Sequence, residues 1–166
     1  MRTVSLTFRE AMNSSQTGEV PIVLITINHP QLVAPIRLTS DPTQVYSYEP
    51  LQYGTVSRGM EFFFYPFNIK LPDDAEERAP SAQIQIENVS RLLVETIRST
   101  TTPATVKLEL VLSSSPNAVE IEWPDFMLTA VTYNDRVMTL NLAIDALVDV
   151  PYPSGSFDPA SFPGLF

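Results

Sequence analysis

The chain of 166 residues has the length of one domain, which buries roughly two thirds of the surface that its unfolded chain exposes. Its 19 acidic and 10 basic residues give a formal charge of −9, which repels nucleic acid and argues against a DNA-binding protein. The absence of cysteine excludes a disulfide framework and thiolate metal sites, and it fits maturation in a reducing compartment.

We expect neither a signal peptide nor a membrane span. Residues 1–5 lack the apolar core of a signal sequence. The longest apolar run, residues 20–27, has the length of a strand and is far shorter than the roughly 18 residues of a spanning helix. Fifteen prolines beside five glycines favour extended segments and fixed turns over long helices.

The first 40 residues predict one helix and two strands. Residues 5–13 carry a weak helical pattern, which predicts a short amphipathic helix. Residues 20–28 predict a strand buried on both faces, because nearly every position is apolar. A His-Pro pair ends this strand, and residues 35–39 predict its hairpin partner, with Ile36 and Leu38 facing inward.

The segment 40–59 is punctuated by proline and glycine and carries three tyrosines. A connection of this length inside a domain is usually functional or contains a small hairpin of its own. Two interpretations stay open, an ordinary irregular excursion and an arm that packs on a neighbouring subunit. For the second, the candidate interface residues are Tyr46, Tyr48 and Tyr53.

Residues 60–71 predict a strand with large aromatic side chains on both faces. A sheet covered on one side only would leave one aromatic row in water. Either the strand lies inside a two-layer core, or another chain covers its outer row. Pro66 favours a bulge or a sheet edge. The candidate interface residues here are Phe62, Phe63, Phe64, Tyr65 and Phe67.

The centre of the chain predicts a strand, a helix and a second strand. Residues 81–87 alternate apolar and polar side chains, as a strand with one buried face does. Residues 88–99 place apolar side chains on one stripe of a helix of about three turns. In the second strand, apolar residues alternate with Lys107 and Glu109.

Three further strands are predicted at residues 118–122, 126–132 and 137–144, with a tight turn at 133–136 between the last two. Seven to nine strands with one main flanking helix, at about 88–99, predict a mainly β fold, either a β-sandwich or a closed barrel.

The last eighteen residues differ in character from the rest of the chain. Four prolines and two glycines disfavour regular structure there, yet the segment is too apolar for a solvated tail. We therefore expect a domain of residues 1–148 followed by an extended strap, residues 149–166, that docks on its own domain or on a partner. The side chains expected to dock are Tyr152, Phe157, Phe162, Leu165 and Phe166.

The sequence offers little for catalysis, and we expect neither an enzyme nor a cofactor or metal site. His29 is the only histidine, no G-x-S-x-G elbow accompanies it, and its place before a proline indicates a turn residue. Glu120 and Glu122 share a strand face as a glycosidase pair might, but nothing indicates a substrate between them. The acidic cluster at 73–77 lacks the spacing of a calcium loop.

Six short motifs in a fixed order resemble a family of phage proteins catalogued as domain of unknown function 1833. Members of that family are similar to minor tail proteins encoded among the tail-tip genes of long-tailed phages. The motifs span nearly the whole chain and lie at residues 3–12, 40–43, 53–59, 71–74, 86–91 and 162–166.

The resemblance implies a tail-tube-like β-sandwich with one flanking helix that assembles into a ring, commonly a hexamer. It implies a distal-tail ring subunit that connects the tail tube to the baseplate or hub, with the tube, tape measure and hub proteins as partners. Its place would be the virion tail, after a stage in the host cytoplasm, without sequence-specific nucleic acid. The alternative is a virion carbohydrate- or receptor-binding module, with exposed tyrosines and Trp123 as stacking platforms.

Overall fold

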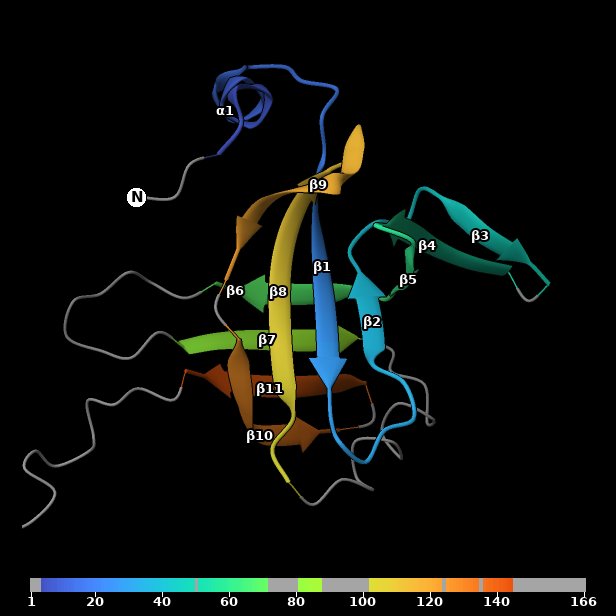
Figure 1. Cartoon of the computed structure of the whole chain (residues 1–166), viewed down its shortest axis with the longest axis vertical. Coiled ribbons are helices and arrows are strands. Elements are labelled where there is room, and N and C mark those ends of the chain that lie inside the picture. Colours follow the sequence, from blue (N-terminus) through green and yellow to red (C-terminus); the bar gives the residue numbers. More distant parts are fainter. Residues whose placement is uncertain are drawn as a thin grey trace, which may run out of the picture.

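A computed structural model describes residues 4–49, 51–71, 81–87, 102–123, 125–134 and 136–144, which form a mainly β structure with one short helix (Figure 1). The predicted mainly β class is therefore confirmed. The predicted helix at 88–99, the acidic cluster at 73–77 and the strap at 149–166 lie outside the described residues.

The helix α1 spans Leu6–Asn13, as the weak pattern at residues 5–13 predicted. Ser5 caps it, because the Ser5 Oγ accepts a hydrogen bond from the Phe8 N–H at 3.1 Å. The Ser5 N–H and hydroxyl donate in turn to the carboxylate of Glu120, at 2.9 and 2.8 Å. No helix among the described residues is long and apolar enough to cross a membrane.

The described residues form eleven strands, more than the seven to nine predicted. The excess arises because the segment 40–59 contributes a hairpin and because Pro66 divides the aromatic segment into two strands. The strands are β1 (Pro21–Asn28), β2 (Ile36–Thr39), β3 (Val45–Tyr48), β4 (Leu51–Ser57), β5 (Met60–Phe64), β6 (Phe67–Lys70), β7 (Ser81–Glu87), β8 (Thr105–Leu112), β9 (Ser115–Glu122), β10 (Phe126–Tyr133) and β11 (Val137–Ala143).

One continuous sheet joins these strands in the order β3-β4-β5-β2-β1-β8-β10-β11-β7-β6, with β9 paired to β8. The longest ladder joins β1 and β8, antiparallel from Pro21 opposite Leu112 to Asn28 opposite Thr105. Strands β2 and β5 pair in parallel, with Leu38 opposite Phe63. Among the described residues the ends of the path, β3 and β6, do not pair with each other, so this sheet is open and not a closed barrel.

The sheet folds back on itself where β8 meets β10. Only Phe126 opposite Val106 and Met127 opposite Thr105 are in register at this junction. Beyond it, β10, β11, β7 and β6 run across the direction of β1, β8 and β2 (Figure 1). The main core lies between these two layers, as in sandwiches whose layers cross steeply. The open, folded sheet thus corresponds to the sandwich of the two predicted alternatives.

Apolar side chains from both layers fill the main core. The alternation predicted for residues 81–87 is confirmed, because Ala82, Ile84 and Ile86 are buried. Trp123 is also in this core, with 6% of its surface exposed, and its backbone N–H donates to the Leu108 carbonyl at 3.1 Å. The expectation that Trp123 is an exposed stacking platform is therefore wrong, because the fold of the sheet covers the indole.

A second, smaller core forms around Phe62, which is only 1% exposed and packs with Ile22, Leu24 and Val111. The next residue of β5, Phe63, faces the other side of the strand and meets Tyr46 edge-on, with ring centroids 5.5 Å apart. The strand therefore has aromatic contacts on both faces, and its side chain at Phe62 is unavailable to a partner.

Candidate interaction surface

The hairpin of β3 and β4, residues 45–57, projects from the two layers, and we call it the arm (Figure 1). Tyr48, at its end, has 81% of its surface exposed. The segment 40–59 thus contains a hairpin with a register shift between Val45 and Ser47 and with exposed apolar side chains, while its contact with a neighbouring subunit stays a prediction. The exposed apolar residues of the arm are Val45, Tyr46, Tyr48, Leu51, Tyr53 and Val56.

A buried carboxylate ties the base of the arm to β2. The side chain of Asp41 accepts hydrogen bonds from the Thr43 N–H at 2.8 Å and from the Thr55 hydroxyl at 3.1 Å. The Thr43 contact closes an Asx turn, which is why Asp before Pro-Thr suits this position. Because Thr55 belongs to β4 and also contacts Thr39 of β2, one side chain links three segments.

Gly54 lets β4 approach β5 closely. A Cβ atom at this position would lie 2.3 Å from the main-chain carbonyl oxygen of Phe62, nearer than real Cβ atoms come to backbone. The Gly54 N–H also donates to the Gln44 carbonyl across the arm at 2.9 Å. Glycine is therefore required here for packing of backbone against backbone.

The turn between β4 and β5 has two residues with positive φ, Arg58 at 50° and Gly59 at 73°. This is the conformation of tight hairpin turns, and it is unfavourable for a side chain such as arginine by about 1–2 kcal/mol. Arg58 compensates through its contacts, beginning with a backbone hydrogen bond from its N–H to the Asn117 side chain of β9.

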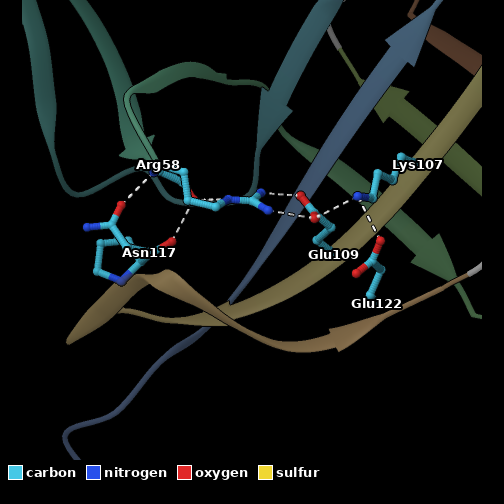
Figure 2. A network of polar contacts seen from close by, with 7 residues as sticks. Arg58, Lys107, Glu109, Asn117 and Glu122 are labelled. Carbon is cyan, nitrogen blue, oxygen red and sulfur yellow. Dashed lines mark hydrogen bonds and ion pairs between the residues drawn. The ribbon is translucent and has the colours of Figure 1, made fainter.

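The Arg58 side chain reaches β8 and pairs with Glu109 (Figure 2). Its Nη1 donates to Oε1 of the carboxylate at 3.0 Å and its Nη2 donates to Oε2, a bidentate arrangement. The Lys107 ammonium lies 3.3 Å from the same carboxylate and 2.7 Å from that of Glu122. These four charged side chains, which we call the ionic cluster, fix the turn of β4 and β5 to β8 and β9.

Glu109 is ionised within this cluster although it is only 2% exposed. Burial on its own would raise the pKa of Glu109, but the hydrogen bonds and positive charges of Arg58 and Lys107 outweigh burial and lower it below the ordinary value of 4.5. The same contact raises the pKa of Arg58 from its ordinary value through the hydrogen bond to Glu109. Both Arg58 and Glu109 therefore carry their charges at neutral pH.

Sequence alternation did not identify Glu109 as buried, because it placed Glu109 opposite the apolar face of the strand. That opposite face is covered in the structure by the turn at Arg58, and Glu122 of the paired strand β9 lies in register beside Glu109. A signal for this contact was present in the Ser-Arg-Gly turn. An arginine held there at a positive φ needs a stabilising partner elsewhere in the fold.

A pocket of about 780 Å³ lies where β2 meets β5 and the first three residues of β4, Leu51 to Tyr53, and we call it the β2–β5 pocket. This volume is within the range of ligand sites. Arg37 and Glu61 are the charged residues of its lining, and the Nε of Arg37 is itself buried without a hydrogen-bond partner among the described residues. Most of the lining is apolar, including Ala34, Ile36, Leu38, Leu51, Phe63 and Phe64.

The structure brings some of the predicted interface residues together and separates others. Tyr53, Phe63, Phe64 and Tyr65 line the β2–β5 pocket, beside the arm. Tyr46 is on the arm, and a side-chain hydrogen bond to Glu61 raises the pKa of its hydroxyl. Phe67 packs on the main core. The strap residues Tyr152, Phe157, Phe162, Leu165 and Phe166 lie outside the described residues.

Polar residues considered for catalysis have structural contacts. His29 is buried at a turn, where Nδ1 accepts from the Gln31 N–H at 3.0 Å and Nε2 contacts the Thr102 carbonyl at 2.9 Å. Glu120 holds the N-terminus of α1, and Glu122 belongs to the ionic cluster, so the two carboxylates serve separate contacts. Among the residues that the structure describes, no group of three or more acidic or histidine side chains is placed to hold a metal ion.

The comparisons with known proteins bear on the whole of this region. None of the curated proteins matches the chain. The family described as a domain of unknown function (DUF1833) matches residues 7–157, a range that contains the arm, the ionic cluster and the β2–β5 pocket. This match covers 151 of the 166 residues. The chain therefore belongs to the DUF1833 family.

Proposed function

We propose that the protein is a non-enzymatic structural component of a phage tail tip, a distal-tail ring subunit that connects the tail tube to the baseplate or hub. The observation that carries this proposal is the arm, which holds six apolar side chains in solvent. Six exposed apolar side chains on one projecting hairpin favour a site of protein contact. The ordered motifs resemble a family whose members are similar to phage minor tail proteins, and this resemblance supports a phage tail as the assembly.

Rigid attachment of the arm supports a role in assembly. An isolated hairpin is marginally stable in water, so an exposed hairpin depends on its anchors. Here Asp41 fixes the arm to β2, and the ionic cluster fixes the end of β4 to β8. An arm held in this way loses little entropy when it meets a partner, which favours specific contact.

The proposed partners are other copies of the chain, in a ring that is commonly a hexamer, and the tail tube, tape measure and hub proteins. Six copies would carry a formal charge of −54, six times the −9 of one chain. A lumen lined by carboxylates would not retain DNA during its passage. The protein would be found in the virion tail, and in the host cytoplasm before assembly.

The test measures the mass of the purified protein by sedimentation and images it in negative stain. We expect rings, and we expect Tyr48→Ser to weaken them without changing the thermal midpoint, because Tyr48 is exposed. Leu6→Ser, at another exposed apolar position far from the arm on α1, is the matched control and should assemble normally. A protein that stays monomeric at every concentration would contradict the proposal.

A carbohydrate- or receptor-binding module is the second candidate. Exposed tyrosines favour it, since Tyr46, Tyr48 and Tyr53 lie on one hairpin and aromatic rings of this kind stack on sugars. Trp123 cannot contribute, because it is buried. Binding of cell-surface glycan by a monomer, lost in Tyr48→Ser, would favour this candidate over the ring subunit.

A further inference from the structure

The register of the arm sorts its side chains by face. In the ladder of β3 and β4, Val45 lies opposite Tyr53. Tyr48 lies opposite Leu51, and residues directly opposite each other in an antiparallel pair share a face. In a regular strand Val45 and Tyr48, three positions apart, would point to opposite faces. The register shift between Val45 and Ser47 adds one residue to β3 and so places both side chains on the same face.

The projecting part of the arm therefore has one apolar face. On the opposite face, the polar side chains of Ser47 and Gln52 form a pair. Glu49, the charged residue of the arm, lies in the turn between the two strands. The side chains that we call the apolar face are uncharged and between 36% and 81% exposed, and they are Val45, Tyr48, Leu51 and Tyr53.

The extra residue of β3, Tyr46, makes its contacts within its own copy. Its aromatic ring meets Phe63 of β5 edge-on, and its hydroxyl donates a hydrogen bond to Glu61 of the same strand. Because β4 lies between β3 and β5 in the sheet, the Tyr46 side chain reaches across a whole strand. The ladder of β4 and β5 begins only at Gly54, so residues 51–53 and β3 project beyond it. Tyr46 thus ties the projecting strand β3 back to β5.

Charge favours a second copy as the partner of the apolar face. Each copy carries a formal charge of −9, so like-charge repulsion opposes contact between two acidic surfaces. Two copies meet the least repulsion where the surface is uncharged. Interface cores are also depleted of charged residues and enriched in tyrosine, and two of the four side chains of the apolar face are tyrosines.

We propose that the arm contacts a second copy through its apolar face, and that Tyr46 is a positioning residue that fixes the direction of the arm. This inference rests on the proposed ring and names the face that would form the contact. The three tyrosines that the sequence grouped as one interface then have two roles. Tyr48 and Tyr53 belong to the contact, whereas Tyr46 acts through β5 of its own copy.

The first experiment compares two neighbouring residues of β4 that point to opposite faces. Leu51→Glu places a carboxylate on the apolar face, and Gln52→Glu places the same charge on the other face. Both positions are exposed, so both full-length variants should keep the thermal midpoint of the unaltered protein. We expect the dissociation constant of self-association, measured by sedimentation, to rise by about tenfold or more for Leu51→Glu and by less than about twofold for Gln52→Glu. Equal weakening by both, or by neither, would overturn the assignment of the face.

The second experiment separates a positioning role from a contact role. The chain has no cysteine, so Glu49→Cys in the turn of the arm and Thr132→Cys on β10, both at exposed positions, can carry spin labels selectively. The distance between the labels is measured at a dilution at which the copies are separate. We expect Tyr46→Ala to broaden the distribution of distances, because β3 loses its tie to β5. Tyr48→Ala should leave the distribution unchanged, while both variants should weaken self-association by about tenfold.

The outcomes distinguish the two roles of the tyrosines. If Tyr46→Ala weakened association without broadening the distances, Tyr46 would be a contact residue, and broadening without weakening would show that the direction of the arm is irrelevant. Either result would overturn the role given to Tyr46. Tyr46→Phe keeps the aromatic ring beside Phe63 and should therefore retain a narrower distribution than Tyr46→Ala. Equal broadening by the two variants would contradict a role of the ring contact.

The same measurements separate this inference from the proposed function. Rings that persist in Leu51→Glu would overturn the contact through the apolar face and leave the ring subunit standing. An unaltered protein that never self-associates would overturn the ring and this contact together.

Discussion

The guanidinium of Arg58 donates two hydrogen bonds to the carboxylate of Glu109, which is 51 positions away in the sequence. One partner has an unfavourable positive φ, and the other is a carboxylate whose side chain is 3% exposed. Each would be costly without the other. This dependence makes the pair the anchor through which the β4–β5 turn is held on β8.

Arg58→Gln should lower the free energy of unfolding by about 3–5 kcal/mol, because it leaves a buried carboxylate without its bidentate partner. Lys107→Gln is the matched control, and it should cost about 1 kcal/mol or less, because Lys107 makes a single contact with Glu109, at 3.3 Å, and the bidentate Arg58 remains in place. Urea unfolding of the three proteins provides the measurement. Equal losses would show that Arg58 has no special role.

Acidification should weaken the contribution of Glu109. Because its pKa is lowered in the folded state from the ordinary 4.5, its stabilising effect is complete above pH 4.5 and disappears as the pH falls through the folded-state value. The advantage in unfolding free energy of the unaltered protein over Glu109→Gln should therefore shrink as the pH falls from about 4.5 through the lowered folded-state pKa. A difference that stays constant over this range would contradict the ionised state.

Gly54→Ala should destabilise the protein by about 1–3 kcal/mol, because the new methyl group meets the Phe62 carbonyl and forces β4 away from β5. Gly18→Ala serves as the control, since a Cβ atom there meets nothing within 4 Å and should change stability by less than about 0.5 kcal/mol. Denaturant midpoints report the global loss. Hydrogen exchange at the Gly54 N–H, which bonds Gln44, reports loosening of the arm.

The two faces of β5 should differ in their response to truncation. Phe62→Ala removes the centre of the second core and should cost about 3–5 kcal/mol. Phe63→Ala should cost less, because Phe63 is partly exposed beside the β2–β5 pocket and loses chiefly its edge-on contact with Tyr46. If thermal midpoints fell equally, the strand would be central on both faces.

The sequence pattern predicted those strands in which buried and exposed side chains alternate regularly. In β7 the period of two follows directly from one buried face, and Pro66 breaks the aromatic segment because proline cannot complete a ladder. The turn at 133–136 was also foreseen, since β10 and β11 pair antiparallel on either side of it. In each case the deciding residues are neighbours in sequence.

Features created by distant segments could not be read in this way. Trp123 is covered because the sheet folds between β8 and β10, and Glu109 is covered because a turn from β4 and β5 reaches over β8. The β2–β5 pocket exists because β2 and β5 pair in parallel, a contact that no local alternation specifies. The predicted interface at the arm would need a second chain, and the sequence of the arm alone indicates only that its apolar side chains are exposed.

Both ends of the sheet path are strands of four residues, β3 and β6. Such short edges offer few free backbone groups, and β6 follows Pro66 and ends in Lys70, two residues that discourage a further strand. These two ends of the path should therefore be poor templates for the edge-to-edge pairing that leads to amyloid. The proposed association of copies would then depend on side chains, which can discriminate between the correct neighbour and an accidental one.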